Sequence, residues 1–147
     1  DLLAFTRKVT GLVTRHPVFR RRRFFAGRPI RTGDEVRDIA WLTPAGTEMT
    51  LQDWDSEFGK SIAVFLNGDA LAEPDQRGEH ITDDSFLLCF NAHEHPVEFA
   101  MPPAGYAQEW TAVLNTTDPT GASHLVVRAG ESVSLTERSL IVLCKTL

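Results

Sequence analysis

The residues whose spacing could hold a metal ion lie in the stretch HEHPVE, residues 93–98. His93 and His95 fall on the same side of an extended strand, because side chains along a strand alternate with a period of two. Glu98 follows a proline bend and could supply a third ligand for zinc or iron. No later histidine motif completes the set, since His124 is isolated. We therefore interpret the pair as solvent-facing residues at a strand end, expect no bound metal, and keep a site of His93, His95 and Glu98 as an alternative.

Closely spaced carboxylates are a second candidate, because general acid and base catalysis uses such pairs. Each pair lies in a polar loop or at a strand end, where a solvated carboxylate is the ordinary state. The sequence also lacks a Gly-x-Ser-x-Gly elbow, a P-loop and a dinucleotide-binding fingerprint. We therefore expect neither an active site nor a cofactor. The pairs are Asp53 with Asp55, Asp83 with Asp84, and Glu94 with Glu98.

The tryptophans are a third candidate, because an exposed indole can stack on a sugar ring. Trp41 and Trp110 lie within strand patterns, which predicts that both are core residues. Trp54 instead lies in the polar stretch LQDWDSEFG, where Asp53 and Asp55 flank it. We therefore take Trp54, Asp53 and Asp55 as candidate carbohydrate contacts, with a packed loop anchor as the alternative.

Four consecutive arginines, Arg20–Arg23, lie in the stretch HPVFRRRRFFAGRPI. Residues 1–37 hold 10 of the 15 Lys and Arg but 3 of the 20 Asp and Glu, although the chain has a net charge of -5. Such a run, flanked by Phe19, Phe24 and Phe25, could bind a polyanion. Four successive side chains cannot all face one way, however, and the rest of the chain is acidic. We therefore interpret the stretch as a junction in which the phenylalanines pack into a core and the arginines face carboxylates or water, and we expect no nucleic-acid partner.

The N-terminal residues predict an amphipathic helix. Apolar side chains recur at steps of three and four residues, at Leu2, Phe5, Val9 and Leu12. Pro17 is expected to end the helix, because the residue before a proline is disfavoured in the helical conformation. A single helix of this length is marginally stable alone, so its apolar face needs a partner surface.

After residue 30 the pattern changes to short apolar stretches separated by turn residues, without another convincing helical pattern. Because crossover helices for parallel pairing are missing, the sequence predicts an all-β, antiparallel β-sandwich of Greek-key type preceded by one helix. Residues 68–84 are polar and predict a long surface loop, and Cys89 and Cys144 are expected to be core thiols within strands. The predicted strand stretches are VRDIAWLTPAG, SIAVFLNGD, FLLCFNAHE, VEFAMPP, EWTAVLNT, HLVVRAGESVSL and RSLIVLCKTL.

The composition fits one main domain with a real core, since 42% of the 147 residues are hydrophobic. No apolar run approaches the roughly 18–20 residues that a membrane-spanning helix needs, and the N-terminus lacks a signal-peptide pattern. We therefore expect a cytoplasmic protein without a membrane partner. Because the chain begins with Asp1 and passes directly into the helical pattern, we also expect it to be a segment of a longer protein.

The order of these stretches, above all HPVFRRRRFF followed by DIAWLTPAGTEMTLQDWD, resembles the C-terminal end of bacterial glycogen debranching enzymes of the isoamylase type, within the α-amylase clan. The resemblance implies that residues 1–30 are the last helix of a catalytic barrel plus a junction, and that residues 31–147 are the C-terminal β-sandwich. It also implies that the helix's apolar stripe faces the barrel wall. The catalytic Asp and Glu of that family lie on barrel strands outside this chain, so the parent would be a glycoside hydrolase while this segment alone would be inactive.

The expected function is therefore that of an accessory C-terminal β-sandwich that supports the barrel of a glycogen debranching enzyme, whose substrate is the α-1,6 branch linkage of glycogen. The expected partners are that barrel and, directly or not, branched α-glucan. One alternative is a stand-alone α-glucan-binding module that uses Trp54. The other is a cupin-like metal-binding protein, because His93 and His95 resemble the first half of the cupin metal motif.

Overall fold

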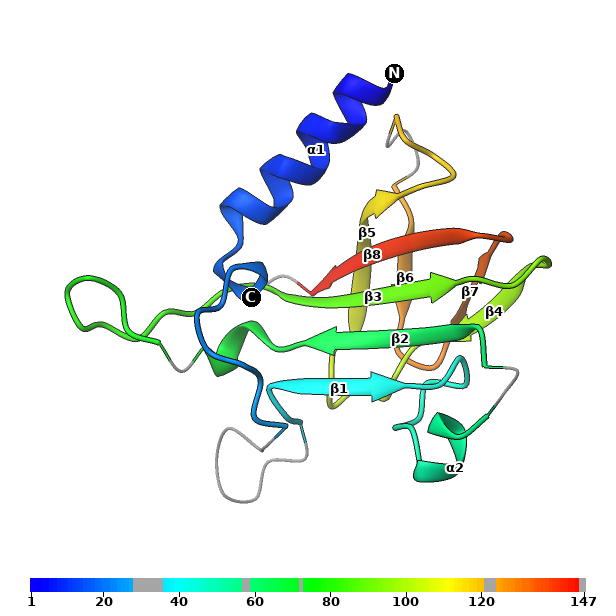
Figure 1. Cartoon of the computed structure of the whole chain (residues 1–147), viewed down its shortest axis with the longest axis horizontal. Helices are drawn as coiled ribbons and strands as arrows, with labels where there is room; N and C mark the ends of the chain where they lie inside the picture. Colours follow the sequence, from blue (N-terminus) through cyan, green and yellow to red (C-terminus); the bar gives the residue numbers. More distant parts are fainter. Residues whose placement is uncertain (28–35, 57–58, 72, 121–123, 146–147) are drawn as a thin grey trace.

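A computed structural model describes residues 1–27, 36–56, 59–71, 73–120 and 124–145. Within them, a long N-terminal helix lies beside a sheet of six antiparallel strands, and a two-stranded sheet covers the opposite face (Figure 1). This arrangement confirms the predicted antiparallel β-sandwich preceded by one helix. The strands are β1 Ile39–Leu42, β2 Ser61–Leu66, β3 Ser85–Asn91, β4 Val97–Ala100, β5 Glu109–Asn115, β6 Val126–Arg128, β7 Ser132–Leu135 and β8 Ser139–Lys145.

Helix α1, Leu2–Arg15, has the bounds that its sequence predicts. The Asp1 carboxylate caps its start by accepting a hydrogen bond of 3.1 Å from the Leu3 backbone N–H. At its end, His16 has an extended conformation and Pro17 begins a short 3-10 helix, η1 Pro17–Phe19. The proline therefore ends the helix, as expected, and turns the chain onto the sandwich.

The large sheet has the strand order β1-β2-β3-β8-β5-β6, and the small sheet pairs β4 with β7. After β3 the chain forms β4 in the small sheet and returns to the large sheet as β5. After β6 it forms β7 in the small sheet and returns as β8, which lies between β3 and β5. The stretch HLVVRAGESVSL does not form one strand but two, β6 and β7. Gly130, with φ of 79°, lies in the turn between them, and this conformation favours glycine.

The main core fills the space between the two sheets. Phe65, Trp110 and Leu143 of the large sheet and Phe99 of the small sheet are at most 1% exposed, so Trp110 is the core residue that its strand pattern predicts. Because side chains alternate along a strand, Val64 and Leu66, which flank Phe65, lie on the opposite face of the large sheet. We call this opposite side the outer sheet face.

Helix α1 and η1 pack on one end of the outer sheet face. Leu12 and Val18 are buried there, and Phe5 and Val9 are partly buried against the same cluster. The expectation that the helix's apolar stripe faces a barrel wall is therefore wrong for these residues, which pack on the sandwich itself. Leu2, 80% exposed, is the member of the stripe that remains uncovered.

Among the described residues, periodicity missed the short α-helix α2, Leu51–Trp54. Its single turn is too short for a hydrophobic period, and its start depends on a capping box instead. The boundary expected between residues 30 and 31 lies outside the described residues. Among those that are described, no helix is long and apolar enough to cross a membrane.

Candidate functional site

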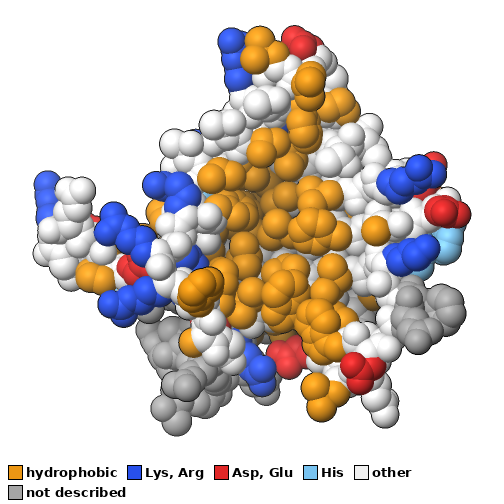
Figure 2. All heavy atoms as spheres, viewed as in Figure 1, with side chains coloured by type: hydrophobic (Ala, Val, Ile, Leu, Met, Phe, Trp, Pro, Cys, Tyr) orange, Lys and Arg blue, Asp and Glu red, His pale blue; other side chains and the backbone are white. Residues whose placement is uncertain are grey.

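The outer sheet face presents a broad apolar surface formed by the described strands. The strand register aligns Trp41, Val64, Leu88 and Val142 in one row across four strands. Figure 2 shows hydrophobic side chains gathered in a continuous band over the middle of this face. The remaining members come from the neighbouring rows of the same strands. They are Ile39, Ile62, Leu66, Phe86, Phe90, Leu140 and Cys144.

The two ends of the outer sheet face differ in how far they are covered. At the end beneath α1 and η1, Phe86 is fully buried. At the other end, Trp41 is 42% exposed and Phe90 is 37% exposed. The prediction that Trp41 is a core residue is therefore wrong, because Trp41 lies on the outer sheet face at the end that α1 does not reach.

A groove of about 730 Å³ lies at this uncovered end. Trp41 and Trp54 border it, with ring centroids 5.6 Å apart at 71° to each other. The Trp54 side chain comes from α2 and is half exposed, at 51%. Ile62 and Phe90 continue the groove onto the sheet. The arrangement offers two accessible indole surfaces beside an apolar floor.

The two carboxylates that flank Trp54 in sequence have different surroundings. Asp53 lines the groove, and its side chain accepts hydrogen bonds from the Thr50 backbone N–H at 2.7 Å and the Thr50 hydroxyl at 2.9 Å. These donors, the backbone N–H first, lower the pKa of Asp53. Asp55 ends α2, is exposed, and is not among the residues that line the groove. The Asp53 carboxylate is therefore engaged in capping the start of α2.

A second cluster of polar residues joins the helical segment to the sandwich. The buried Asp83 carboxylate receives a hydrogen bond of 3.0 Å from the Val18 backbone N–H and lies 2.7 Å from His16 Nδ1. The His16 ring also packs edge-on against Phe86, with centroids 4.8 Å apart. The interpretation of Asp83 as a solvated loop residue is wrong, because the carboxylate satisfies backbone and imidazole groups at the seam between α1 and β3.

Glycine is required behind this cluster. A Cβ at Gly68 would lie 2.0 Å from the backbone oxygen of Asp83, and the Asp83 N–H donates to the Gly68 carbonyl at 3.1 Å. The close approach of these two backbones places the Asp83 carboxylate under η1. The start and the end of the expected surface loop 68–84 are thus parts of the sandwich.

Asp38 holds the arginine segment in a similar way. Its buried carboxylate accepts hydrogen bonds from the backbone N–H groups of Ala26, Gly27 and Ile39 at 2.7–2.9 Å. The Arg21 guanidinium lies 3.8 Å from the same carboxylate. Nothing in the charge pattern distinguished Asp38 from exposed acids, so the sequence reasoning missed it.

The arginine run is a junction, as expected, although one phenylalanine departs from the prediction. Phe19 and Phe25 pack against the cluster beneath α1, and Arg21 lies over the Phe25 ring at 4.0 Å. Phe24, in contrast, is 99% exposed. The expectation that all three phenylalanines pack into a core is wrong for Phe24, whose neighbour Phe25 takes the inward position.

His93 and His95 line neither the groove beside Trp41 nor the pocket at the arginine segment. The His93 and His95 rings are 4.8 Å apart, centroid to centroid, in the turn between β3 and β4, and Glu98 lies on β4. Among the described residues, the one group whose ligand atoms lie within 4.8 Å of one another is His16, Asp83 and Asp84. A site of His93, His95 and Glu98 stays an untested alternative.

Taken together, a β-sandwich with its own core and a partly uncovered apolar sheet face is typical of an accessory domain that packs on another domain. Residues 38–145 match the family described as "Isoamylase, C-terminal". The chain belongs to this family of isoamylase C-terminal domains. The matched residues begin at the buried Asp38 and end at the last residue of β8.

Relatives extend the match through α1. The "Glycogen operon protein GlgX homolog" of Mycobacterium bovis and that of Mycobacterium tuberculosis are each 63% identical over 147 residues, which is 100% of this chain and 20% of the relative. "Isoamylase 2, chloroplastic" of Oryza sativa subsp. japonica is 23% identical over 121 residues, which is 77% of this chain and 13% of the relative. The chain thus spans about one fifth of the length of the Mycobacterium relatives.

Proposed function

We propose that this chain is the C-terminal accessory β-sandwich of a glycogen debranching enzyme and docks on the catalytic region through its outer sheet face. The observation that carries the proposal is the apolar band that α1 leaves uncovered, with Trp41 and Phe90 at its open end. Exposed apolar patches of this kind mark protein interfaces. The names and lengths of the relatives support a larger parent whose remaining residues could cover the band.

In this function the chemistry belongs to the parent's catalytic barrel, which hydrolyses the α-1,6 branch linkages of glycogen with a pair of carboxylates. The sandwich contributes by covering and stiffening one side of that barrel. We propose a cytoplasmic location as well, because Cys89 and Cys144 are buried thiols, as is usual in a reducing compartment.

The test compares one substitution in two settings. Phe90→Glu should lower the thermal stability of the 147-residue chain less than that of the parent, because Phe90 is already 37% exposed in the chain. In the full-length parent the same change would bury a charge in the interface, so we expect a loss of about 2 kcal/mol or more and reduced debranching. The measurements are thermal unfolding of both proteins and reducing-end release from branched glucan.

Phe24→Glu is the matched control, since Phe24 is 99% exposed and lies off the outer sheet face. It should be nearly neutral in both settings. Equal, small effects of Phe90→Glu in the chain and in the parent would contradict docking through this face. Debranching by the 147-residue chain alone would contradict the assignment of the chemistry to the barrel.

A second candidate function is α-glucan binding at the groove between Trp41 and Trp54. The observation that favours it is the pair of accessible indoles beside Asp53, with Asp55 following at the end of α2. Trp54→Ala should abolish retardation of the chain in glycogen affinity electrophoresis, because the sugar would lose a stacking surface. Leu51→Ala, an exposed position on the same helix, is the control. Unretarded migration of the unmodified chain would exclude this function.

A further inference from the structure

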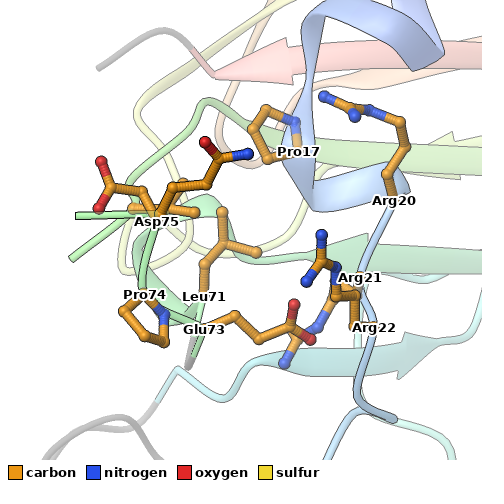
Figure 3. A pocket seen from close by; sticks show the side chains of 10 residues that line it. Pro17, Arg20, Arg21, Arg22, Leu71, Glu73, Pro74 and Asp75 are labelled. Carbon is orange, nitrogen blue, oxygen red and sulfur yellow. The ribbon is translucent and has the colours of Figure 1, made fainter. Parts of the chain in front are cut away.

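A pocket of about 330 Å³ lies where the arginine segment faces the loop that follows η2, Gly68–Ala70. In Figure 3, Arg20, Arg21 and Arg22 lie along one side, and Leu71, Glu73, Pro74 and Asp75 lie along the other. The pocket shares no residue with the outer sheet face. An inference about it therefore stands apart from the docking proposal.

The Arg21 side chain is an unusual lining group because it is 9% exposed and incompletely paired. One face of its guanidinium covers the Phe25 ring, and its Nη2 lies at the long distance of 3.8 Å from Asp38. Its Nη1 is buried and has no hydrogen-bond partner among the described residues. Buried N–H groups of proteins are almost always paired, so this nitrogen calls for an acceptor oxygen.

The charge of the lining suits a small anion. Arg20 and Arg22 lie at exposed positions on either side of Arg21 and add two further guanidinium groups. The opposing carboxylates bind backbone N–H groups of their own surroundings, Glu73 that of Arg23, and Asp75 those of Arg77 and Glu79. The formal charge of the lining is therefore positive, and the acids are held by other donors.

The same pocket has apolar walls formed by Pro17, Leu71 and Ile81. A ligand that presents oxyanion oxygens to the arginines can place a ring or chain against these side chains. Planar guanidinium groups bind phosphate with parallel hydrogen bonds and are weakly hydrated, which makes arginine the preferred residue for such sites.

We propose that this pocket is a binding site for a small phosphate monoester, whose phosphate accepts a hydrogen bond from the Arg21 guanidinium once the unpaired Nη1 turns toward the bound oxygen. Arg20 and Arg22 close over the remaining oxygens, and the organic part of the ligand lies against Leu71 and Ile81. Because the pocket joins the segment after α1 to the sandwich, an occupied site would tie these two parts of the chain together.

The test is calorimetric titration of the 147-residue chain with inorganic phosphate and with phenyl phosphate at constant ionic strength. Phenyl phosphate should bind more tightly than inorganic phosphate, because its ring contacts the apolar walls. Arg21→Leu should weaken the binding of both by at least about tenfold, the usual effect of losing a charge-assisted hydrogen bond. Circular dichroism checks that this variant is folded.

Glu73→Gln gives a test of opposite sign that does not depend on removing Arg21. It deletes a negative charge from the wall while keeping an oxygen for the Arg23 N–H, so phosphate should bind several-fold more tightly. Glu79→Gln, on the same loop but outside the lining, should leave the affinity unchanged. Absence of phosphate binding in the millimolar range, or binding that is insensitive to both Arg21→Leu and Glu73→Gln, would overturn the proposal.

Discussion

Replacing Asp83 by alanine should loosen the attachment of the helical segment to the sandwich. In the structure this carboxylate is 8% exposed, lies 2.7 Å from His16 Nδ1 and accepts the Val18 N–H at 3.0 Å. Val18 is itself 2% exposed, so its N–H would lose its acceptor in a place that water hardly reaches. The segment 2–19 then keeps its apolar contacts but loses the polar contacts that orient them.

The magnitude follows from the groups left unpaired. A buried donor without an acceptor costs about 1–3 kcal/mol, and a hydrogen bond to a charged group contributes about 1.5–3 kcal/mol. Since the two effects overlap at Val18 and His16, we expect Asp83→Ala to lower the free energy of unfolding by about 3 kcal/mol. For a domain of this size that corresponds to a fall in Tm of roughly 6–12 °C.

Thermal unfolding measures this loss, and hydrogen exchange of amides in residues 2–19 shows where it occurs. The amide of Val18 should exchange faster in Asp83→Ala, and amides of β3 and β8 should change less. Glu79→Ala, an exposed acid on the same loop, is the control and should leave both readouts unchanged. If the Tm of Asp83→Ala stays within about 1 °C of that of the unmodified 147-residue chain and the Val18 amide stays protected from exchange, Asp83 does not hold the helical segment on the sandwich.

Three further predictions concern single sites. Gly68→Ala should destabilise the chain by about 1–3 kcal/mol, since its Cβ would meet the Asp83 backbone oxygen at 2.0 Å, whereas Gly105→Ala, in open space, should be nearly neutral in urea unfolding. The pKa of Asp53 is lowered by the Thr50 donors, so its capping contribution is present above the unfolded pKa and is lost as pH falls through the folded pKa. The protection of α2 amides, measured as exchange relative to the intrinsic rate at each pH, should therefore fall in acid, and Asp53→Asn should remove that dependence. Burial raises the pKa of Cys89 to about 12, so its thiol should resist a disulfide reagent at neutral pH until denaturant is added.

The sequence predicted the elements where one physical signal dominates. The three-and-four spacing of Leu2 to Leu12 with Pro17 fixed α1 closely, because helix periodicity and the proline boundary are both local. Trp110 followed from its place in an apolar strand. Trp41 also lies in a strand pattern and was expected in the core, but the pattern could not tell whether its part of the sheet would be covered. That depends on where α1 lies, and the contact is distant in sequence.

The burial of Asp83 could not be predicted from the sequence for a related reason. Asp83 and Asp84 are adjacent acids in a polar stretch, and only the fold distinguishes the buried one from its neighbour. Asp83 becomes buried because Gly68 allows the two backbones to approach and because the N–H of Val18, within η1, donates to its carboxylate. Each partner is unremarkable in sequence. Their combination is a property of the tertiary structure.

The composition of the central strands gives a last argument for a second covering domain. Strand β2 reads SIAVFL and β3 reads SFLLCFN, so both are apolar on their two faces. Strands of this kind are typical of sheets covered on both sides, whereas a sheet with one wet face alternates apolar with polar residues. On one side, the large sheet is buried in the core that it shares with the small sheet. On the outer sheet face, α1 and η1 cover Phe86 at one end of β3. Phe90, which lies on the same face near the other end of β3, stays partly exposed. The uncovered length of β2 and β3 is therefore where the proposed docking predicts contact with the catalytic region of the parent.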